Sequence, residues 1–75
     1  MSEKLQEIVA DIFDLDESMV LPQTGKSNVD SWDSLNHLSL MTAVEKEFRI
    51  RFTMAEIEAV DTVEQLQTLI EKHRV

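Results

Sequence analysis

Asp33, Ser34 and His37 are the residues of this chain whose types and spacing most resemble a catalytic site. A carboxylate, a hydroxyl and an imidazole are the side chains of a serine-hydrolase triad, and His37 stands one helical turn after Ser34. The helical period, however, turns His37 toward an apolar face, and no loop supplies an oxyanion hole. A chain of 75 residues also leaves little room for a substrate pocket. We therefore expect no catalytic residues, and a minimal serine hydrolase is a disfavoured alternative.

Residues that bind metals do not fall into a recognised spacing. The chain has no cysteine, which removes thiolate ligands, disulfide bonds and any thiol of its own. Asp14, Asp16 and Ser18 match the first spacings of a calcium-binding loop. That loop requires glycine where Met19 stands and glutamate where Gly25 stands, so the match fails. We assign no metal site.

The elements that must position Ser34 are expected to be helices, because the chain has one glycine and one proline. The pattern predicts a single all-α domain over residues 1–75, with three amphipathic helices and one short helix packed around a Leu, Ile, Val and Phe core. The helices are expected at Glu3 to Leu15, at Ser34 to Phe48, after Thr53 to about Ala59, and after Thr62 to about His73. A long flexible loop, Asp16 to Asp33, separates the first two helices.

Local signals mark the helix ends. Ser2 is a candidate N-cap of the first helix. Thr53–Glu56 and Thr62–Gln65 each have the form of a capping box, in which two side chains bind free amides at the start of the helix. His73 stands near the end of the last helix, where a histidine makes a favourable contact with the helix dipole.

The apolar periods predict the buried faces. The first helix is expected to bury Leu5, Ile8, Val9, Ile12 and Leu15. The second is expected to bury Leu40, Met41, Val44 and Phe48, with His37 on the same face. In the last helix the shared face contains Val63, Leu66, Leu69, Ile70 and His73.

The formal net charge of −8 limits the partners. Binding of nucleic acid needs clustered Lys and Arg, so we expect none, and the same charge disfavours anionic membranes. No apolar run approaches a membrane span or a signal core, so neither membrane insertion nor a targeting segment is expected. We expect a cytoplasmic monomer.

Ser34 stands where the loop ends and the second helix begins. Free amides and the positive end of the helix dipole gather there and suit a phosphate. The hydroxyl is expected to be exposed, where another protein can reach it. Position alone leaves a simpler alternative open, because Ser and Asp are the usual N-cap residues. If Ser34 is the cap, Ser34→Ala costs about 0.5–2 kcal/mol of stability.

Asp33-Ser34-Leu35 resembles the Asp-Ser-Leu motif of acyl carrier proteins. The similarity continues through WDSLNHLSLMTAVEKEFRIRFTMAEIEAVDTVEQLQTLIEKH. The motif serine opens a helix that ends in Ala-Val-Glu-Lys-Glu-Phe, and a short helix and a Thr-Val-initiated helix follow. With the amphipathic first helix and the long loop, the resemblance covers essentially the whole chain.

The resemblance implies that 4′-phosphopantetheine is attached covalently to Ser34. A phosphopantetheinyl transferase would move the group from coenzyme A with a divalent metal. Asp33 would help position Ser34 and be read by the transferase, with pure helix capping as the alternative. The arm ends in the thiol that a cysteine-free chain lacks, and it would carry acyl-type intermediates as thioesters to and from acyl-activating or acyl-transferring enzymes. The domain itself would perform no reaction.

The resemblance also implies a partner surface beside the motif serine. Leu35 and Leu38 lie away from the predicted core face, and with Trp32, Thr42 and Glu45 they are the predicted partner contacts. Packing at the helix end is the alternative for the two leucines. For Trp32 the alternative is a loop anchor that lies on the bundle.

The chain departs from the common fatty-acid-synthesis pattern, which often has a glycine shortly before the motif and acidic residues along the second helix. Here Trp32 precedes the motif, and Lys46, Arg49 and Arg51 offset the acidic residues. Trp-Asp-Ser-Leu resembles stand-alone carriers of polyketide, hybrid peptide or surface-sugar modification systems, so pathway and cargo stay open, fatty acid synthesis included. The alternative from another class is an unmodified acidic helical interaction module, in which Ser34 only caps a helix.

Overall fold

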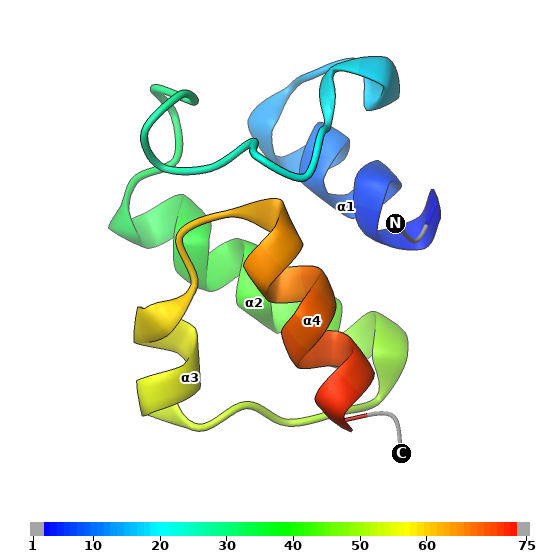
Figure 1. Cartoon of the computed structure of the whole chain (residues 1–75), viewed down its shortest axis with the longest axis vertical. Coiled ribbons are helices and arrows are strands. Elements are labelled where there is room, and N and C mark those ends of the chain that lie inside the picture. The colour runs from blue at the N-terminus through cyan, green and yellow to red at the C-terminus, as the bar shows by residue number, and fades with distance from the viewer. Residues whose placement is uncertain (1–2, 74–75) are drawn as a thin grey trace.

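Four α-helices and one short 3-10 helix make up the chain in a computed structural model that describes residues 3–73 (Figure 1). The elements are α1 (Glu3–Phe13), η1 (Glu17–Met19), α2 (Ser34–Phe48), α3 (Met54–Ala59) and α4 (Val63–His73). Within the described range the only β-type pairing is an isolated bridge between Gly25 and Thr62. The predicted all-α class, with three longer helices and one short one, is confirmed. Ser2, the predicted cap of α1, lies outside the described residues.

The first helix ends two residues earlier than predicted. Asp14 adopts a left-handed conformation with φ of 55°, which terminates α1 at Phe13, and the Leu15 amide bonds back to the Ala10 carbonyl at 2.9 Å. The buried face is also rotated from the predicted one. Ala10 and Phe13 are buried together with Leu5 and Val9, whereas the predicted Ile8, Ile12 and Leu15 are only half-buried.

The second helix has the predicted bounds and most of the predicted core face, but Phe48 is only half-buried. It buries His37, Leu40, Met41 and Val44 and ends where Arg49 turns left-handed with φ of 57°. These side chains join the apolar residues of α1, α4 and the loop in one core. The core contains Leu5, Val9, Ala10, Phe13, Val20, Trp32, Leu40, Met41, Val44, Phe52, Val60, Val63, Leu66 and Ile70.

Both predicted capping boxes are present. The Thr53 hydroxyl accepts from the Glu56 amide at 3.1 Å, and the Glu56 carboxylate accepts from the Thr53 amide at 2.8 Å. At the start of α4, Thr62 and Gln65 make the same reciprocal pair at 3.2 Å in each direction. The chain therefore begins α3 and α4 where its local signals place them.

The long loop is tied down, which corrects the expectation of a flexible segment. Between α1 and α2 the chain forms η1 and then crosses to the start of α4 (cyan to green in Figure 1). Backbone hydrogen bonds join the two segments from Val63 to Thr24 at 2.8 Å, from Glu64 to Pro22 at 2.9 Å and from Lys26 to Asp61 at 3.0 Å. The start of α4 thereby holds the middle of the loop, and the loop delivers α2 from a fixed point.

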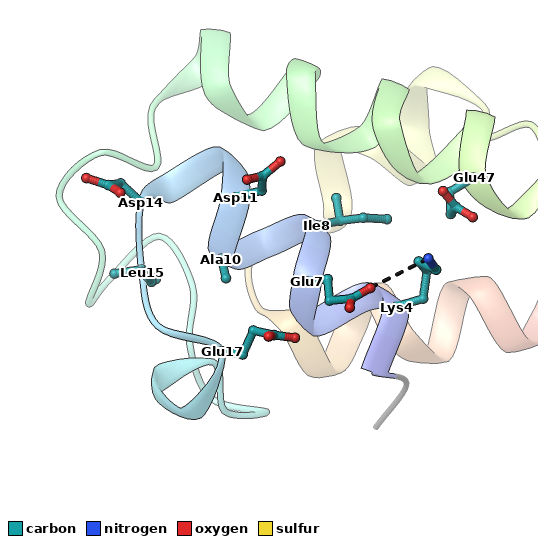
Figure 2. Close-up of a pocket in the computed structure, with 9 residues that line it drawn as sticks. All are labelled: Lys4, Glu7, Ile8, Ala10, Asp11, Asp14, Leu15, Glu17 and Glu47. Atoms are coloured by element: carbon teal, nitrogen blue, oxygen red, sulfur yellow. Dashed lines mark ion pairs between the residues drawn. The ribbon is translucent and has the colours of Figure 1, made fainter.

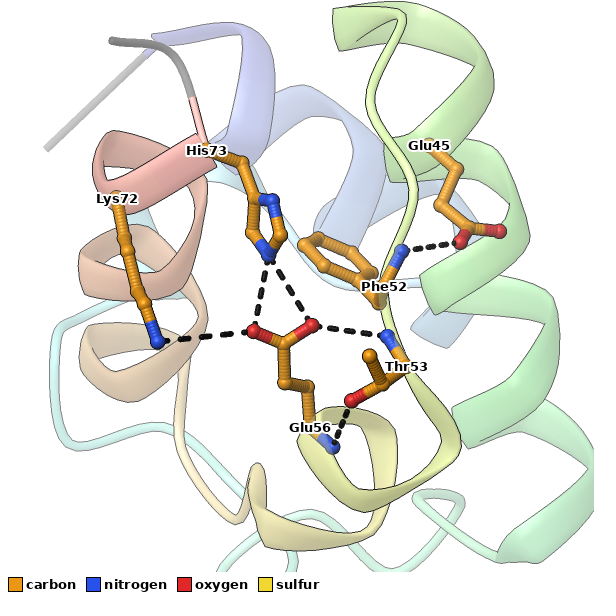
Figure 3. Close-up of polar contacts among 6 residues, drawn as sticks. All are labelled: Glu45, Phe52, Thr53, Glu56, Lys72 and His73. Atoms are coloured by element: carbon orange, nitrogen blue, oxygen red, sulfur yellow. Dashed lines mark hydrogen bonds and ion pairs between the residues drawn. The ribbon is translucent and has the colours of Figure 1, made fainter.

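A second correction concerns His73, which was expected to contact only the helix dipole. Its Nε2 lies 3.0 and 3.1 Å from the two carboxylate oxygens of Glu56, and its ring meets Phe52 edge-on at 5.4 Å (Figure 3). Glu56 thus caps α3 and also links it to the end of α4. Lys72 adds a longer contact of 3.9 Å to the same carboxylate.

Gly25 is expected to tolerate no side chain. A Cβ at this position would overlap the Asp61 carbonyl oxygen and lie 2.9 Å from the Thr62 Cα, both of which are backbone atoms. Gly25→Ala should therefore lower the free energy of unfolding by about 1–3 kcal/mol in urea denaturation. The neighbouring exposed Ser27→Ala serves as control and should change it by less than about 0.5 kcal/mol. Equal stability of Gly25→Ala and wild type would contradict the close packing of loop and α4.

The Glu56 contacts predict an acid-sensitive contribution to stability. The hydrogen bond from the Thr53 amide, followed by that from His73, lowers the pKa of Glu56 below its ordinary 4.5, and slight desolvation opposes the shift. A pKa lowered by folding stabilises the fold fully above the unfolded pKa, and this contribution is lost as the pH falls through the folded value. In urea titrations, the stability difference between wild type and Glu56→Gln should be present above the ordinary pKa of 4.5 and should shrink as the pH falls below it. A difference independent of pH would contradict this role.

Candidate functional site

Ser34 is the first residue of α2, and it is exposed. Asp33, not Ser34, is the N-cap, because the Asp33 Oδ1 accepts from the Asn36 amide at 2.9 Å. Among the described residues, none is hydrogen-bonded to the Ser34 hydroxyl, so this group is available for reaction.

Trp32 lies in the core, two residues before Ser34. Only 5% of it is exposed, and its ring stacks on Phe13 of α1 at 4.6 Å with an interplanar angle of 16°. Its Nε1 donates to His37 Nδ1 at 2.9 Å. A buried ring with a satisfied N–H fits the alternative of a loop anchor, and a partner contact at Trp32 stays a prediction.

His37 is buried on the core face, as its place in the helical period predicts. Its Nδ1 accepts from Trp32, and its Nε2 lies 2.7 Å from the Ile57 carbonyl oxygen. Both ring nitrogens are therefore occupied, and neither is available to take a proton from Ser34. The geometry provides no general base for the hydrolase alternative.

An apolar groove begins at Ser34 and runs between α2 and α3. Its volume is about 450 Å³. It is lined by Lys26, Trp32, Asp33, Ser34, His37, Leu38, Met54, Ile57 and Glu58. Ser34 is thus one of the residues that line this groove.

Three exposed apolar side chains surround the groove mouth and the helix start. Leu35 is 73% exposed, Leu38 is 48% exposed and Met54 is 65% exposed. Leu35 and Leu38 therefore lie away from the core, as predicted. The alternative of packing at the helix end does not explain why both side chains are exposed. The sequence analysis missed Met54, although its place directly after the Thr53 cap puts it in the exposed first turn of α3.

Thr42 and Glu45 differ in their surroundings. Thr42 is exposed on α2. The carboxylate of Glu45 instead accepts from the Phe52 amide at 2.8 Å (Figure 3), so it closes the connection between α2 and α3. It also stands 11 residues after Ser34, or about 16 Å along the helix at 1.5 Å per residue. Glu45 thus makes a structural contact, and its role as a partner contact stays a prediction.

The negative charge concentrates away from Ser34. A groove of about 570 Å³ along α1 is lined mostly by carboxylates (Figure 2). Its residues are Lys4, Glu7, Ile8, Ala10, Asp11, Asp14, Leu15, Glu17 and Glu47. Over residues 3–73, no three His, Asp or Glu side chains are grouped so that they could hold a metal ion.

Comparison with known proteins places this site in a family. The sequence profile described as the phosphopantetheine attachment site matches residues 3–70. The acyl carrier protein of Rubrobacter xylanophilus is 32% identical over 72 residues, which cover 96% of this chain and 89% of that protein. The acyl carrier protein of Thermosynechococcus vestitus is 32% identical over 68 residues, covering 91% of this chain and 84% of that protein.

A solved structure agrees with the sequence relatives. The solution NMR structure of holo acyl carrier protein from Geobacter metallireducens superimposes with a TM-score of 0.83 at 30% identity, and covers 95% of this chain and 82% of that one. The chain therefore belongs to the acyl carrier protein family. It is a carrier protein rather than an enzyme, and the predicted covalent phosphopantetheine is confirmed for the family. No helix within residues 3–73 is long and apolar enough to cross a bilayer.

Leu38→Glu is expected to separate partner recognition from folding. Because about half of Leu38 is exposed, the substitution should change the free energy of unfolding by less than about 0.5 kcal/mol. It should slow modification by a phosphopantetheinyl transferase, because a charge replaces apolar surface beside Ser34. Thr68→Glu, at an exposed position of α4 that is not among the predicted partner contacts, is the matched control. A large loss of stability in Leu38→Glu would place the side chain in the core and contradict the assignment.

Proposed function

We propose that the Ser34 hydroxyl takes the 4′-phosphopantetheine arm and that the chain delivers thioester-bound acyl intermediates to partner enzymes. The observation that supports Ser34 is its exposed hydroxyl in the first turn of α2, beside the capping Asp33 and at the mouth of an apolar groove. The Asp-Ser-Leu sequence at the same position fits the family profile that spans this segment.

The helix start suits the chemistry of attachment. Transfer forms a phosphoester between the Ser34 oxygen and the phosphate of the arm. A phosphate there lies close to the free amides and the positive dipole end of α2. Asp33 holds this first turn through the Asn36 amide, and so it orders the backbone from which the Ser34 side chain projects. When bound, the arm supplies the thiol on which acyl groups travel.

Within residues 3–73, no base is hydrogen-bonded to the Ser34 hydroxyl. Both nitrogens of His37 are engaged, and one oxygen of the Asp33 carboxylate accepts from the Asn36 amide. We therefore propose that the transferase removes the proton of the hydroxyl. This division of labour agrees with a protein that presents a group and does not itself catalyse a reaction.

The surroundings of Ser34 suit an apolar cargo and apolar contacts. Leu38, Met54 and Ile57 line the groove, and Leu35 extends the exposed apolar surface. We propose fatty, polyketide or related acyl groups as cargo, and acyl-activating or acyl-transferring enzymes as partners besides the transferase. The working form proposed is a cytoplasmic monomer with one domain over residues 1–75.

The second candidate is an unmodified acidic module that binds a basic partner. The observation that favours it is the carboxylate-lined groove of α1, which creates a negative field apart from Ser34. In that case Ser34 would stay bare.

Intact-protein mass spectrometry after incubation with coenzyme A, Mg²⁺ and a broad-specificity transferase tests the proposal. Wild type should gain one phosphopantetheine. Ser34→Ala should gain none and should keep its thermal stability, because Asp33 provides the cap. The matched control, Ser31→Ala, should be modified normally. Absence of a gain on folded wild type would favour the acidic module.

A further inference from the structure

A buried chain of hydrogen bonds joins three segments around Ser34. Trp32 ends the long loop, His37 lies in the second turn of α2, and Ile57 lies in α3. The indole N–H of Trp32 donates to His37 Nδ1 at 2.9 Å, and His37 Nε2 lies 2.7 Å from the Ile57 carbonyl oxygen. His37 is 5% exposed, so water does not substitute for either contact.

These partners select one tautomer of His37. An indole N–H can only donate, so Nδ1 must be the acceptor. A carbonyl oxygen can only accept, so Nε2 must carry the hydrogen and donate it to Ile57. The neutral imidazole with hydrogen on Nε2 satisfies both contacts. Among residues 3–73, His37 is the only side chain that is hydrogen-bonded both to the end of the loop and to α3.

The residues of α3 themselves make few buried contacts. None of the six is buried and Ile57 is only half-buried, whereas Phe52 before the helix and Val60 after it lie in the core. Its first turn is held by Glu56, which binds the Thr53 amide and His73 (Figure 3). Its last turn is held by His37 through the Ile57 carbonyl. A shift of α3 therefore changes the contact with His37.

The other end of the chain of hydrogen bonds lies two residues from Ser34. Trp32 is clamped between Phe13 and His37, and only Asp33 separates it from Ser34. The same groove is lined by Trp32 and Ser34 on one side and by Met54 and Ile57 on the other. His37 lies between the two sides.

We propose that His37 is a positioning residue that couples the α3 wall of the groove to the loop end that presents Ser34. An apolar occupant that pushes α3 outward would stretch the contact between His37 and Ile57 and would shift Trp32 through the same ring. The relevance of this coupling to a carrier rests on the proposed function, since it connects groove occupancy with the attachment residue.

Trp32 provides a direct reporter because it is the only tryptophan. Its indole N–H gives one NMR signal, and the exchange rate of that hydrogen with solvent reports how well the hydrogen bond is closed. The unmodified full chain is used throughout. Ile57→Ala perturbs the α3 wall, and Leu69→Ala on α4 is the control for a loss of a half-buried apolar side chain that does not line the groove.

Two substitutions of His37 by an amide residue separate its two hydrogen bonds, the one accepted from Trp32 and the one donated to Ile57. In His37→Asn the amide oxygen takes the place of Nδ1, so the acceptor for Trp32 is kept and the donor to Ile57 is lost. In His37→Gln the amide nitrogen takes the place of Nε2, so the donor to Ile57 is kept and the acceptor for Trp32 is lost.

Coupling through His37 predicts a specific pattern. Ile57→Ala should raise indole exchange about fivefold or more relative to Leu69→Ala after correction for global stability, as expected for directly coupled residues. In the His37→Asn background, the indole should stay protected, and Ile57→Ala should have no further effect. His37→Gln should lose the protection outright.

Two results would overturn the proposal. One is equal indole exchange in Ile57→Ala and Leu69→Ala, a comparison that needs no His37 variant to fold. The other is an Ile57→Ala effect that is the same in wild type and in His37→Asn. Because the chain is unmodified, failure of Ser34 to accept phosphopantetheine would leave this test unaffected, so the two proposals fail separately.

Discussion

The burial of Trp32 is the constraint on which the site depends. Its ring stacks on Phe13 of α1, and its N–H is satisfied by His37 of α2, so one side chain fixes the end of the loop against two helices. A buried N–H without a partner would cost about 1–3 kcal/mol, so the facing residue must present an acceptor. Two residues later the chain reaches the surface, and Ser34 opens α2 in a fixed and exposed position.

The charge distribution complements this arrangement. The carboxylates of α1 and its neighbours gather in one groove, whereas the surroundings of Ser34 are mostly apolar, with Leu35, Leu38 and Met54 exposed. A net charge of −8 can steer a basic partner from a distance. Near Ser34, apolar side chains and a few charged ones, Lys26, Asp33 and Glu58, share the surface that a partner would meet.

Local features of the sequence predicted the helices well, because caps and apolar periods act over a few residues. The Thr53 capping box and the start of α2 at Ser34 are examples. The loop was mispredicted because the contacts that order it are distant in sequence: Gly25 packs on Thr62, and nothing near Gly25 signals this. The contact of Glu45 with the Phe52 amide was missed for the same reason, since it depends on how the chain turns after α2.

The central claim is that the fold presents Ser34, among all the serines of the chain, for attachment of the arm. Fragmentation mass spectrometry of the chain after treatment with transferase and coenzyme A tests this most directly, because it locates the added group on a residue. The account predicts phosphopantetheine on Ser34 in the folded protein and on no other serine. Modification of Ser31 or Ser39 instead, or a folded chain without any modification, would contradict it.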